Sequence, residues 1–411
     1  MNYKPVQPNE RIIFLDILRG IAILFIFIAN AYTFSGWYDL PEEIKSQFSG
    51  ARLNSVIKQL TVIFIDGKWY SVFSILFGIG FVIQFENARK NNKPFVSFFL
   101  RRMLGLLFFG LIHLFFLWFG DILTLYALIG FGLILFRNLS NKKLLIWAGI
   151  LLTLPTIHIL LMVSFNFFYP EILFQKALAY LSENNIPFIM EEGRFDYYDY
   201  AQTRLDGNSW KQFFLLNFVM PLIRLYGLLY EGRIFKVLAC FLIGIWAGRK
   251  ILHHGLLQNR NLLKKITLYG FLIGIPMNIL WAYGQVQSQE VWRLINYISY
   301  AVGVVPLACG YAATVALLLN SGHKYLSIFA PVGQMAMSNY IFQTIISIAI
   351  FYGIGFGLAL DTTLWQVILL VIIVFIIQIL FSYIWLKNFK YGPLEWVWRM
   401  MTYKKYIPNK K

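Results

Sequence analysis

The sequence has few charged residues for its length. They make up 13% of its 411 residues, whereas soluble domains contain about 25%. Hydrophobic residues account for 59%, and a soluble fold of this size needs more polar side chains to cover its surface. The shortage of charge therefore argues against a soluble protein and favours one that lies in a lipid bilayer.

Two other shortages narrow the chemistry. The only two cysteines, Cys240 and Cys309, lie in apolar stretches, which is typical of inert core residues. The chain has no P-loop, dinucleotide-binding glycine fingerprint, HExxH zinc motif or GxSxG nucleophile turn. His253 and His254 are adjacent, which is a poor geometry for two ligands of one ion. We therefore expect no metal centre, and primary pumping by this chain alone is not expected.

What the sequence does contain is a series of long apolar runs. A helix needs about 20 apolar residues to cross a hydrocarbon core of about 30 Å. Such segments must be helical, because lipid offers an exposed backbone no hydrogen-bond partner. The runs predict an all-α, polytopic helical bundle: a single integral membrane domain over residues 1–411 with about ten transmembrane helices. We place these helices at residues 12–34, 60–86, 103–119, 122–136, 144–168, 234–248, 266–284, 293–319, 331–352 and 364–386.

Positive charge is concentrated in short segments between these runs. The formal net charge of +17 would suit a nucleic-acid-binding protein, but here Lys and Arg follow the positive-inside pattern of membrane proteins. This pattern argues against nucleic acid as a partner and places both termini, with the basic tail 387–411, in the cytoplasm. The acidic, tyrosine-rich stretch 169–210 is the long polar loop, and we expect it to be extracytoplasmic.

Residues 211–231 leave the number of crossings open. The stretch is apolar, but Pro221 interrupts it and Arg224 lies inside it. If it crossed, the basic segment that begins at Arg249 would fall on the outer side, against the positive-inside rule. We therefore favour a re-entrant or interfacial helix, with an eleventh spanning helix as the alternative.

Ionisable residues in membrane helices are costly and usually face a cavity or a partner, so they mark candidate sites. Near the start of the chain are Arg11, Asp16 and Arg19. Asp16 and Arg19 are three residues apart and therefore lie on one helix face. They form either an internal ion pair that lowers the cost of insertion or a cationic pocket for an acidic group such as a phosphate. The sequence favours neither the ion pair nor the cationic pocket over the other.

A second cluster lies in GLIHLFFLWFGDILTLYAL, residues 110–128. It contains His113, Trp118, Asp121 and Tyr126. A histidine in mid-membrane is more often a hydrogen-bonded core residue, but one beside a carboxylate can act as a general base. Asp121 would share a helix face with His113 only if the helix continued through Gly120.

Other polar residues in or beside the apolar runs are candidates for lining a cavity. Asn339 and Gln343 share a face at i, i+4, and they either line a polar cavity or, as we favour, bond a neighbouring helix. The small residues Ser74, Gly78 and Gly80 indicate close contact between helices. The candidate cavity-lining residues are Asp66, Trp118, Tyr126, Arg224, Arg233, Arg249, Asn339 and Gln343.

Several stretches together resemble a known family. They are RIIFLDILRGIA at 11–22, WYSVFSILFGIGF at 69–81, residues 101–128 with the cluster above, the Gly-Arg pair ending at 249, VGQMAMSNYIFQ at 332–343 and YGPLEWVWR at 391–399. With them the chain resembles the YeiB-like bacterial membrane family, a domain of unknown function, over nearly its whole length. The resemblance implies a place in the bacterial cytoplasmic membrane.

That family is grouped with a superfamily of transmembrane acyltransferases, which includes lysosomal heparan-glucosaminide acetyltransferase and O-antigen acetylases. The resemblance implies transfer of an acyl group from acyl-CoA to a sugar or another extracytoplasmic or lipid-linked acceptor. By analogy, His113 would be the base or acyl carrier, with Asp121 beside it, and Arg11, Asp16 and Arg19 would belong to the donor site.

A second reading is a proton-coupled transporter or exporter of a small or lipid-linked solute. Asp16, Asp66, Asp121 and His113 would then form a proton relay. The residues leave both readings open, as well as the oligomeric state.

Overall fold

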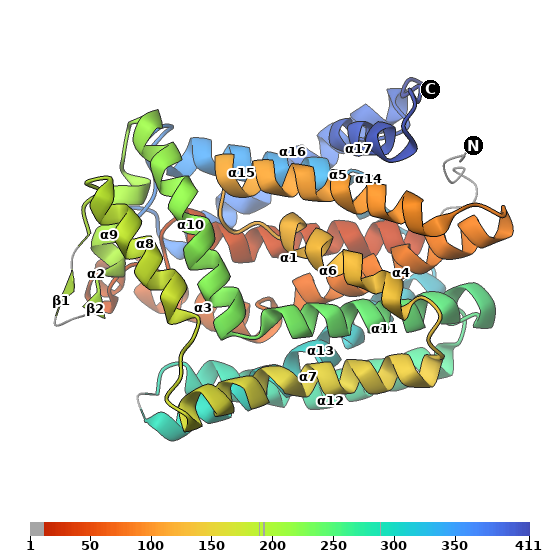
Figure 1. Ribbon diagram of the computed structural model, residues 1–411, viewed down its shortest axis with the longest axis horizontal. Coiled ribbons are helices and arrows are strands. Elements are labelled where there is room, and N and C mark those ends of the chain that lie inside the picture. The colour runs from red at the N-terminus through yellow and green to blue at the C-terminus, as the bar shows by residue number, and fades with distance from the viewer. Residues whose placement is uncertain (1–11, 189, 192–193, 288) are drawn as a thin grey trace.

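The computed structural model describes residues 12–411 except 189, 192–193 and 288. The long helices run roughly side by side and form an elongated bundle (Figure 1). The only sheet in the described chain is a two-stranded hairpin, in which β1 (Met190–Glu191) pairs antiparallel with β2 (Arg194–Phe195). The predicted all-α class is confirmed.

Eight described helical segments are long and apolar enough to cross a membrane, and two shorter apolar helices accompany them. The predicted multi-span architecture is therefore confirmed. The long segments are α1 (Ile13–Phe34), α3 with α4 (Ala51–Phe64 and Lys68–Lys90), α5 (Phe95–Phe116), α7 (Asn141–Ser164), α10 (Trp210–Tyr230), α12 (Arg260–Gly284), α13 (Glu290–Asn320) and α16 (Leu364–Asn388), and the short ones are α6 (Leu123–Phe136) and α15 (Ala336–Phe351).

The helix α11 (Arg233–His254) takes the place of the span expected at 234–248. It is not among the eight segments above, and basic residues lie at both its ends, yet most of its middle is buried against α4 and α7. A Cβ on Gly78 would lie 2.1 Å from the carbonyl oxygen of Phe241, and one on Gly244 would lie 2.1 Å from that of Ile75. The expected close helix contact at Gly78 is thus confirmed, whereas Gly80 meets no other helix.

The two ends of the bundle carry different caps (Figure 1). At one end lie α2 (Glu42–Gln47), α8 (Glu171–Glu183), α9 (Tyr197–Leu205) and the hairpin, so the long polar loop 169–210 is largely folded. The ion pair between Arg204 and Asp39, 3.0 Å apart, ties α9 to the chain that follows α1. The helix α10 lies obliquely to the bundle axis near this end, rather than along it.

At the other end lie the C-terminus and α17 (Pro393–Tyr403). The basic tail expected at 387–411 folds back: the backbone N–H of Lys390 donates to the carbonyl of Asn409, and the indole N–H of Trp396 donates to that of Ile407. The indole of Trp398 anchors α17 to α5 through the carbonyl of Arg102, at 2.8 Å.

The span expected at 331–352 is not one helix. It consists of a 3-10 turn η2 (Lys324–Phe329), the short helix α14 (Ala330–Gln334) and α15, with a break at Met335. The break is stabilised from outside. The carboxylate of Glu395 in α17 accepts hydrogen bonds from the backbone N–H groups of Met337 and Ser338 and from the Ser338 hydroxyl. An acidic side chain at a helix N-terminus satisfies its free donors and complements its dipole.

Candidate functional site

A large cavity, here called the wide cavity, opens among α1, α4, α10, α12 and α13. Its volume is about 970 Å³. Four of the predicted cavity residues line it: Asp66, Trp118, Arg224 and Arg233. The other polar and aromatic lining includes Asn30, Tyr70, Glu231, Trp281, Gln285, Arg293, Asn296 and Tyr300.

A second space, here called the narrow cavity, lies toward α17 and has a volume of about 290 Å³. Asp16 and Arg19, predicted to bind an acidic group, line it, and so does Tyr126. Its walls are largely apolar, with basic residues from three different helices. They include Leu76, Phe77, Phe81, Arg102, Met103, Tyr340, Glu395, Trp398 and Arg399.

The two cavities are separated by the turn between α5 and α6, residues 117–122, and by the side chain of His113, which together are here called the layer. In the turn between α5 and α6, Trp118 and Gly120 face the wide cavity, while Ile122 and Leu123 face the narrow one. A hydrogen bond joins the two sides: the hydroxyl of Tyr340, which lines the narrow cavity, donates to the carbonyl of Gly120 at 3.3 Å. The ring of Trp118 lies against Gly120, where a Cβ would come within 2.1 Å of it.

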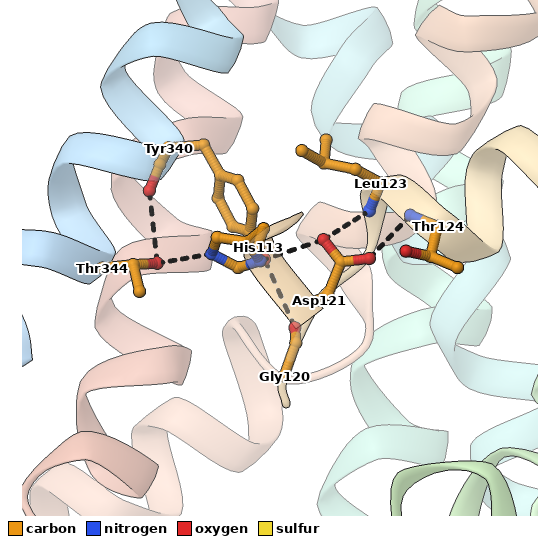
Figure 2. Close-up of polar contacts among 7 residues, drawn as sticks. All are labelled: His113, Gly120, Asp121, Leu123, Thr124, Tyr340 and Thr344. Carbon is orange, nitrogen blue, oxygen red and sulfur yellow. Dashed lines mark hydrogen bonds and ion pairs between the residues drawn. The ribbon is translucent and has the colours of Figure 1, made fainter. Parts of the chain in front are cut away.

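The pair His113 and Asp121 lies inside this layer (Figure 2). The helix α5 ends at Phe116, and the chain then turns so that Asp121 folds back toward His113. The distance from Nδ1 of His113 to Oδ1 of Asp121 is 3.0 Å, and both side chains are fully buried. The carboxylate also accepts the backbone N–H groups of Leu123 and Thr124, at 3.1 and 2.6 Å, and so caps the start of α6.

The second ring nitrogen of His113 faces α15. Its Nε2 lies 2.9 Å from Oγ1 of Thr344, whose hydroxyl is 3.5 Å from the carbonyl of Tyr340. Because a carboxylate only accepts, a neutral His113 carries its proton on Nδ1 and leaves a lone pair on Nε2. That lone pair is the one a general base needs, and the hydroxyl of Thr344 occupies it in this structure. His113 and Asp121 line neither cavity, although each cavity begins one residue from Asp121.

At the narrow cavity, Arg19 Nη1 lies 2.9 Å from Oδ1 of Asp16 and 3.4 Å from the carbonyl of Gly333. Arg11 lies outside the described residues. The structure adds two cations that the sequence analysis missed: Arg102, stacked 3.8 Å over the ring of Trp398, and Arg399. The tryptophans of YGPLEWVWR could have indicated such a contact, because arginine often stacks on aromatic rings.

Glu395 is the second carboxylate that lines the narrow cavity, besides Asp16. Burial raises the pKa of Glu395, and the hydrogen bond from the Ser338 hydroxyl works in the opposite direction. The three bonds that it accepts give it a structural role at the break before α15.

At the wide cavity, Asp66 accepts a hydrogen bond of 3.4 Å from the hydroxyl of Tyr38. Arg233 lies 2.5 Å from the carboxylate of Glu231 and 5.5 Å from the centre of the Tyr70 ring. Sequence reasoning missed Lys236, one turn further along α11, which is only 4% exposed. Its ammonium lies 3.5 Å from the centre of the Tyr300 ring.

Three predicted cavity residues do not line either cavity. Asn339 bonds the hydroxyl of Ser382 at 3.0 Å, and Gln343 bonds Gln378 at 2.9 Å, so both hold α15 to α16, which is the alternative favoured from the sequence. The guanidinium of Arg249 donates to the carbonyls of residues 137 and 139 at 2.7 and 2.6 Å, and so fixes the turn between α6 and α7. These residues are better explained by helix packing than by a cavity.

In the part of the chain that the structure describes, no three His, Cys, Asp or Glu side chains converge as they would around a metal ion. The two cysteines are free, and Cys240 is buried. The arrangement therefore offers acid–base chemistry at the layer and cations in each cavity.

Comparison with known proteins gives relatives along the whole chain. The chain is 33% identical over 99% of its length to the uncharacterized protein YxaH of Bacillus subtilis, of which 98% is covered. It is 26% identical over 96% of its length to the uncharacterized protein YeiB of Escherichia coli, of which 96% is covered. An uncharacterized 39.9 kDa protein in the amylase 3' region of Bacillus acidopullulyticus is 26% identical over 98% of the chain and 97% of its own length. The expected kinship with YeiB is confirmed.

No solved structure matches the chain. Residues 247–405, from the end of α11 to α17, match the family described as "Protein of unknown function (DUF418)". The chain, a multi-span membrane protein homologous to YeiB and YxaH over its full length, belongs to the DUF418 family.

Proposed function

We propose that this protein is a membrane acyltransferase that moves an acyl group from acyl-CoA in the narrow cavity to an acceptor in the wide cavity. The observation that carries the proposal is the position of His113 and Asp121 in the layer between the two cavities, where Gly120 lines one cavity and Ile122 lines the other. A base between two substrate spaces suits a transfer in which donor and acceptor arrive from opposite sides.

The narrow cavity suits the donor. The guanidinium groups of Arg19, Arg102 and Arg399 supply cations for the CoA phosphates, and a guanidinium can bind two phosphate oxygens at once. The volume of about 290 Å³ is too small for a whole CoA. The nucleotide would therefore stay among the cations near α17, and the apolar walls would receive the pantetheine arm and the acyl group.

The chemistry follows from the tautomer of His113. Its Nε2 takes the proton from an acceptor hydroxyl or amine as the oxygen or nitrogen of that group attacks the thioester carbonyl. The new C–O or C–N bond forms, the C–S bond breaks, and the CoA thiolate leaves with the proton returned from the imidazolium. Asp121 stabilises the imidazolium while it exists. For this step Thr344 must release Nε2, and the turn at Trp118–Gly120 must open.

We orient the protein with the α17 end in the cytoplasm of a bacterium, where acyl-CoA is made, and the α8–α9 end outside. The basic loop after α4, with Arg89, Lys90 and Lys93, supports this orientation by the positive-inside rule. The oblique course of α10 supports a bundle in which this helix does not cross.

The test is label transfer from labelled acetyl-CoA with the purified protein in detergent, in which CoA release is also followed. His113→Ala should lower both by about 100-fold or more, the usual contribution of a general base. His158→Ala is the matched control, because His158 lies in α7, bonds Tyr169 and lines neither cavity. Equal rates for wild type and His113→Ala would remove His113 from the mechanism.

A proton-coupled transporter is the second candidate, favoured by one specific feature. Asp16 lines the narrow cavity, Asp66 lines the wide one, and the buried pair with His113 lies between them, so acid–base groups are spaced through the protein. Proton-driven uptake into liposomes that Asp121→Asn abolishes, with no acyl transfer by the wild type, would favour this function over the enzyme.

A further inference from the structure

The wide cavity holds more positive than negative side chains. Arg224, Arg233 and Arg293 line it, against the carboxylates of Asp66 and Glu231 among the described residues. Glu231 is already bonded by Arg233 at 2.5 Å. An excess of cations in a partly enclosed space attracts an anion, because low-dielectric walls concentrate the field there.

Two of the cations near the cavity have donors without a hydrogen-bond acceptor. The ammonium of Lys236 is buried and has no such partner within the described chain, and neither has Nε of Arg224. A buried charged group without hydrogen bonds is unfavourable, so such donors indicate a ligand or a water that completes them. Arg224 lines the wide cavity together with Trp118 and Gly120 of the layer.

A side pocket connects Lys236 to this group. Tyr70, Glu231, Arg233 and Tyr300 line both this pocket and the wide cavity. The pocket has a volume of about 20 Å³, which is enough for one water molecule. A water there would relay the ammonium of Lys236 to an anion held by the two arginines.

The rest of the lining suits a polyhydroxylated molecule. Among the described residues, buried Oδ1 of Asn296 is an acceptor without a donor, and buried Nε1 of Trp118 is a donor without an acceptor. Glutamines at 285, 287 and 289 offer further amide groups, and the rings of Trp281 and Tyr300 offer flat apolar faces. Amides that bond hydroxyls, together with rings that cover their C–H faces, are suited to a sugar or polyol.

We propose that the wide cavity binds a phosphorylated polyol or sugar, with its phosphate held by Arg224 and Arg233 and supported by Lys236. The proposal rests on the proposed function only where it names this molecule as the acyl acceptor, whose hydroxyl would then lie toward the layer. The phosphate belongs either to a soluble molecule or to a lipid headgroup, and both have the same chemistry at the site.

The test is calorimetric titration of the purified protein in a non-ionic detergent with sn-glycerol 3-phosphate, without any acyl donor. Saturable binding is expected, and Arg224→Gln and Lys236→Met should each weaken it by about tenfold or more, since both remove a charged partner. Arg224→Lys keeps the charge and should recover part of the affinity. Lys211→Gln is the matched control: Lys211 is exposed on the same helix, and its loss should leave binding unchanged.

Further ligands test whether the site recognises the phosphate or the polyol, and whether the phosphate belongs to a soluble molecule or to a lipid. Glycerol should not bind, and inorganic phosphate should bind more weakly than glycerol phosphate. Where the soluble ligand fails, a higher melting temperature in phosphatidylglycerol than in phosphatidylcholine nanodiscs, lost in Arg224→Gln, would assign the phosphate to a lipid. Absence of both effects overturns the proposal, and so does equal affinity for phosphate and glycerol phosphate, or unchanged affinity in a folded Arg224→Gln.

Failure here and failure of the enzyme can be told apart. Binding of glycerol phosphate without label transfer from acetyl-CoA would leave the anion site standing and remove the acyltransferase. Label transfer to a neutral sugar by a protein that binds no phosphate would do the reverse.

Discussion

The two cavities contain similar residue types but differ in how many of their polar groups are paired within the protein. In the narrow cavity the protein itself occupies many of the polar groups: Arg19 pairs with Asp16, Arg102 stacks on Trp398, and Glu395 caps α15. Within the described chain, three residues that line the wide cavity, Trp118, Arg224 and Asn296, have a buried polar atom without a hydrogen-bond partner, whereas at the narrow cavity only Gln84 has one. The comparison teaches that the polar groups of the narrow cavity are largely used to hold the protein together, whereas those of the wide cavity keep more of their hydrogen-bonding capacity.

The layer between the cavities should give the largest effect when altered. In Asp121→Asn the neutral amide can still cap α6 through its oxygen, but it no longer stabilises a positive His113. We expect label transfer to fall by about 100-fold or more, while the melting temperature changes little. Asp121→Ala, which also removes the cap, should cost about 1 kcal/mol of stability in addition. If Asp121→Asn kept full activity, the layer would be a structural partition alone.

The narrow side can be loosened at Glu395. Glu395→Ala removes the acceptor of three hydrogen bonds at the break before α15 and leaves two backbone donors unsatisfied. We expect a loss of about 2–3 kcal/mol, seen as a lower melting temperature in detergent. Glu395→Gln keeps an acceptor and should lose clearly less. Equal melting temperatures for wild type and Glu395→Ala would show that α15 does not need this cap.

The smallest effect is expected at the polar contacts that line neither cavity. Asn339→Ala removes the bond to Ser382 between α15 and α16. Hydrogen bonds between membrane helices contribute about 0.6 kcal/mol on average, so the melting temperature should fall only slightly and glycerol phosphate binding should not change. A loss of ligand binding comparable with that of Arg224→Gln would mean that Asn339 faces a cavity after all.

Features that depend on local sequence were predictable. The apolar runs mark the membrane helices because the bilayer fixes their length, and the ion pair of Asp16 with Arg19 follows from helical periodicity. The pairing of His113 with Asp121 was suspected from their spacing, although it arises through a turn and not through a continuous helix.

Features that depend on distant segments were not predictable. Arg102 stacks on Trp398, 296 residues further along the chain, as the hydrogen bond between these two residues records. In the sequence, Met335 lies in an apolar run that gives no sign of a break. The carboxylate that stabilises the break comes from α17, which is distant in the sequence. From the sequence, Lys236 is expected to be a basic residue at the solvated end of a membrane helix. In the structure its ammonium lies over the rings of Tyr70 and Tyr300.

The cap that Glu395 provides has a practical consequence. Thr344 and Tyr340, which contact the His113 layer, lie on the helix whose first turn α17 holds. The very end of the chain is tied down as well, since the backbone N–H of Lys411 donates to the carbonyl of Asn388. A purification tag fused directly after Lys411 would therefore disturb contacts that are connected, through α17 and α15, to His113. A long flexible spacer before the tag would keep assays of this protein faithful to its native state.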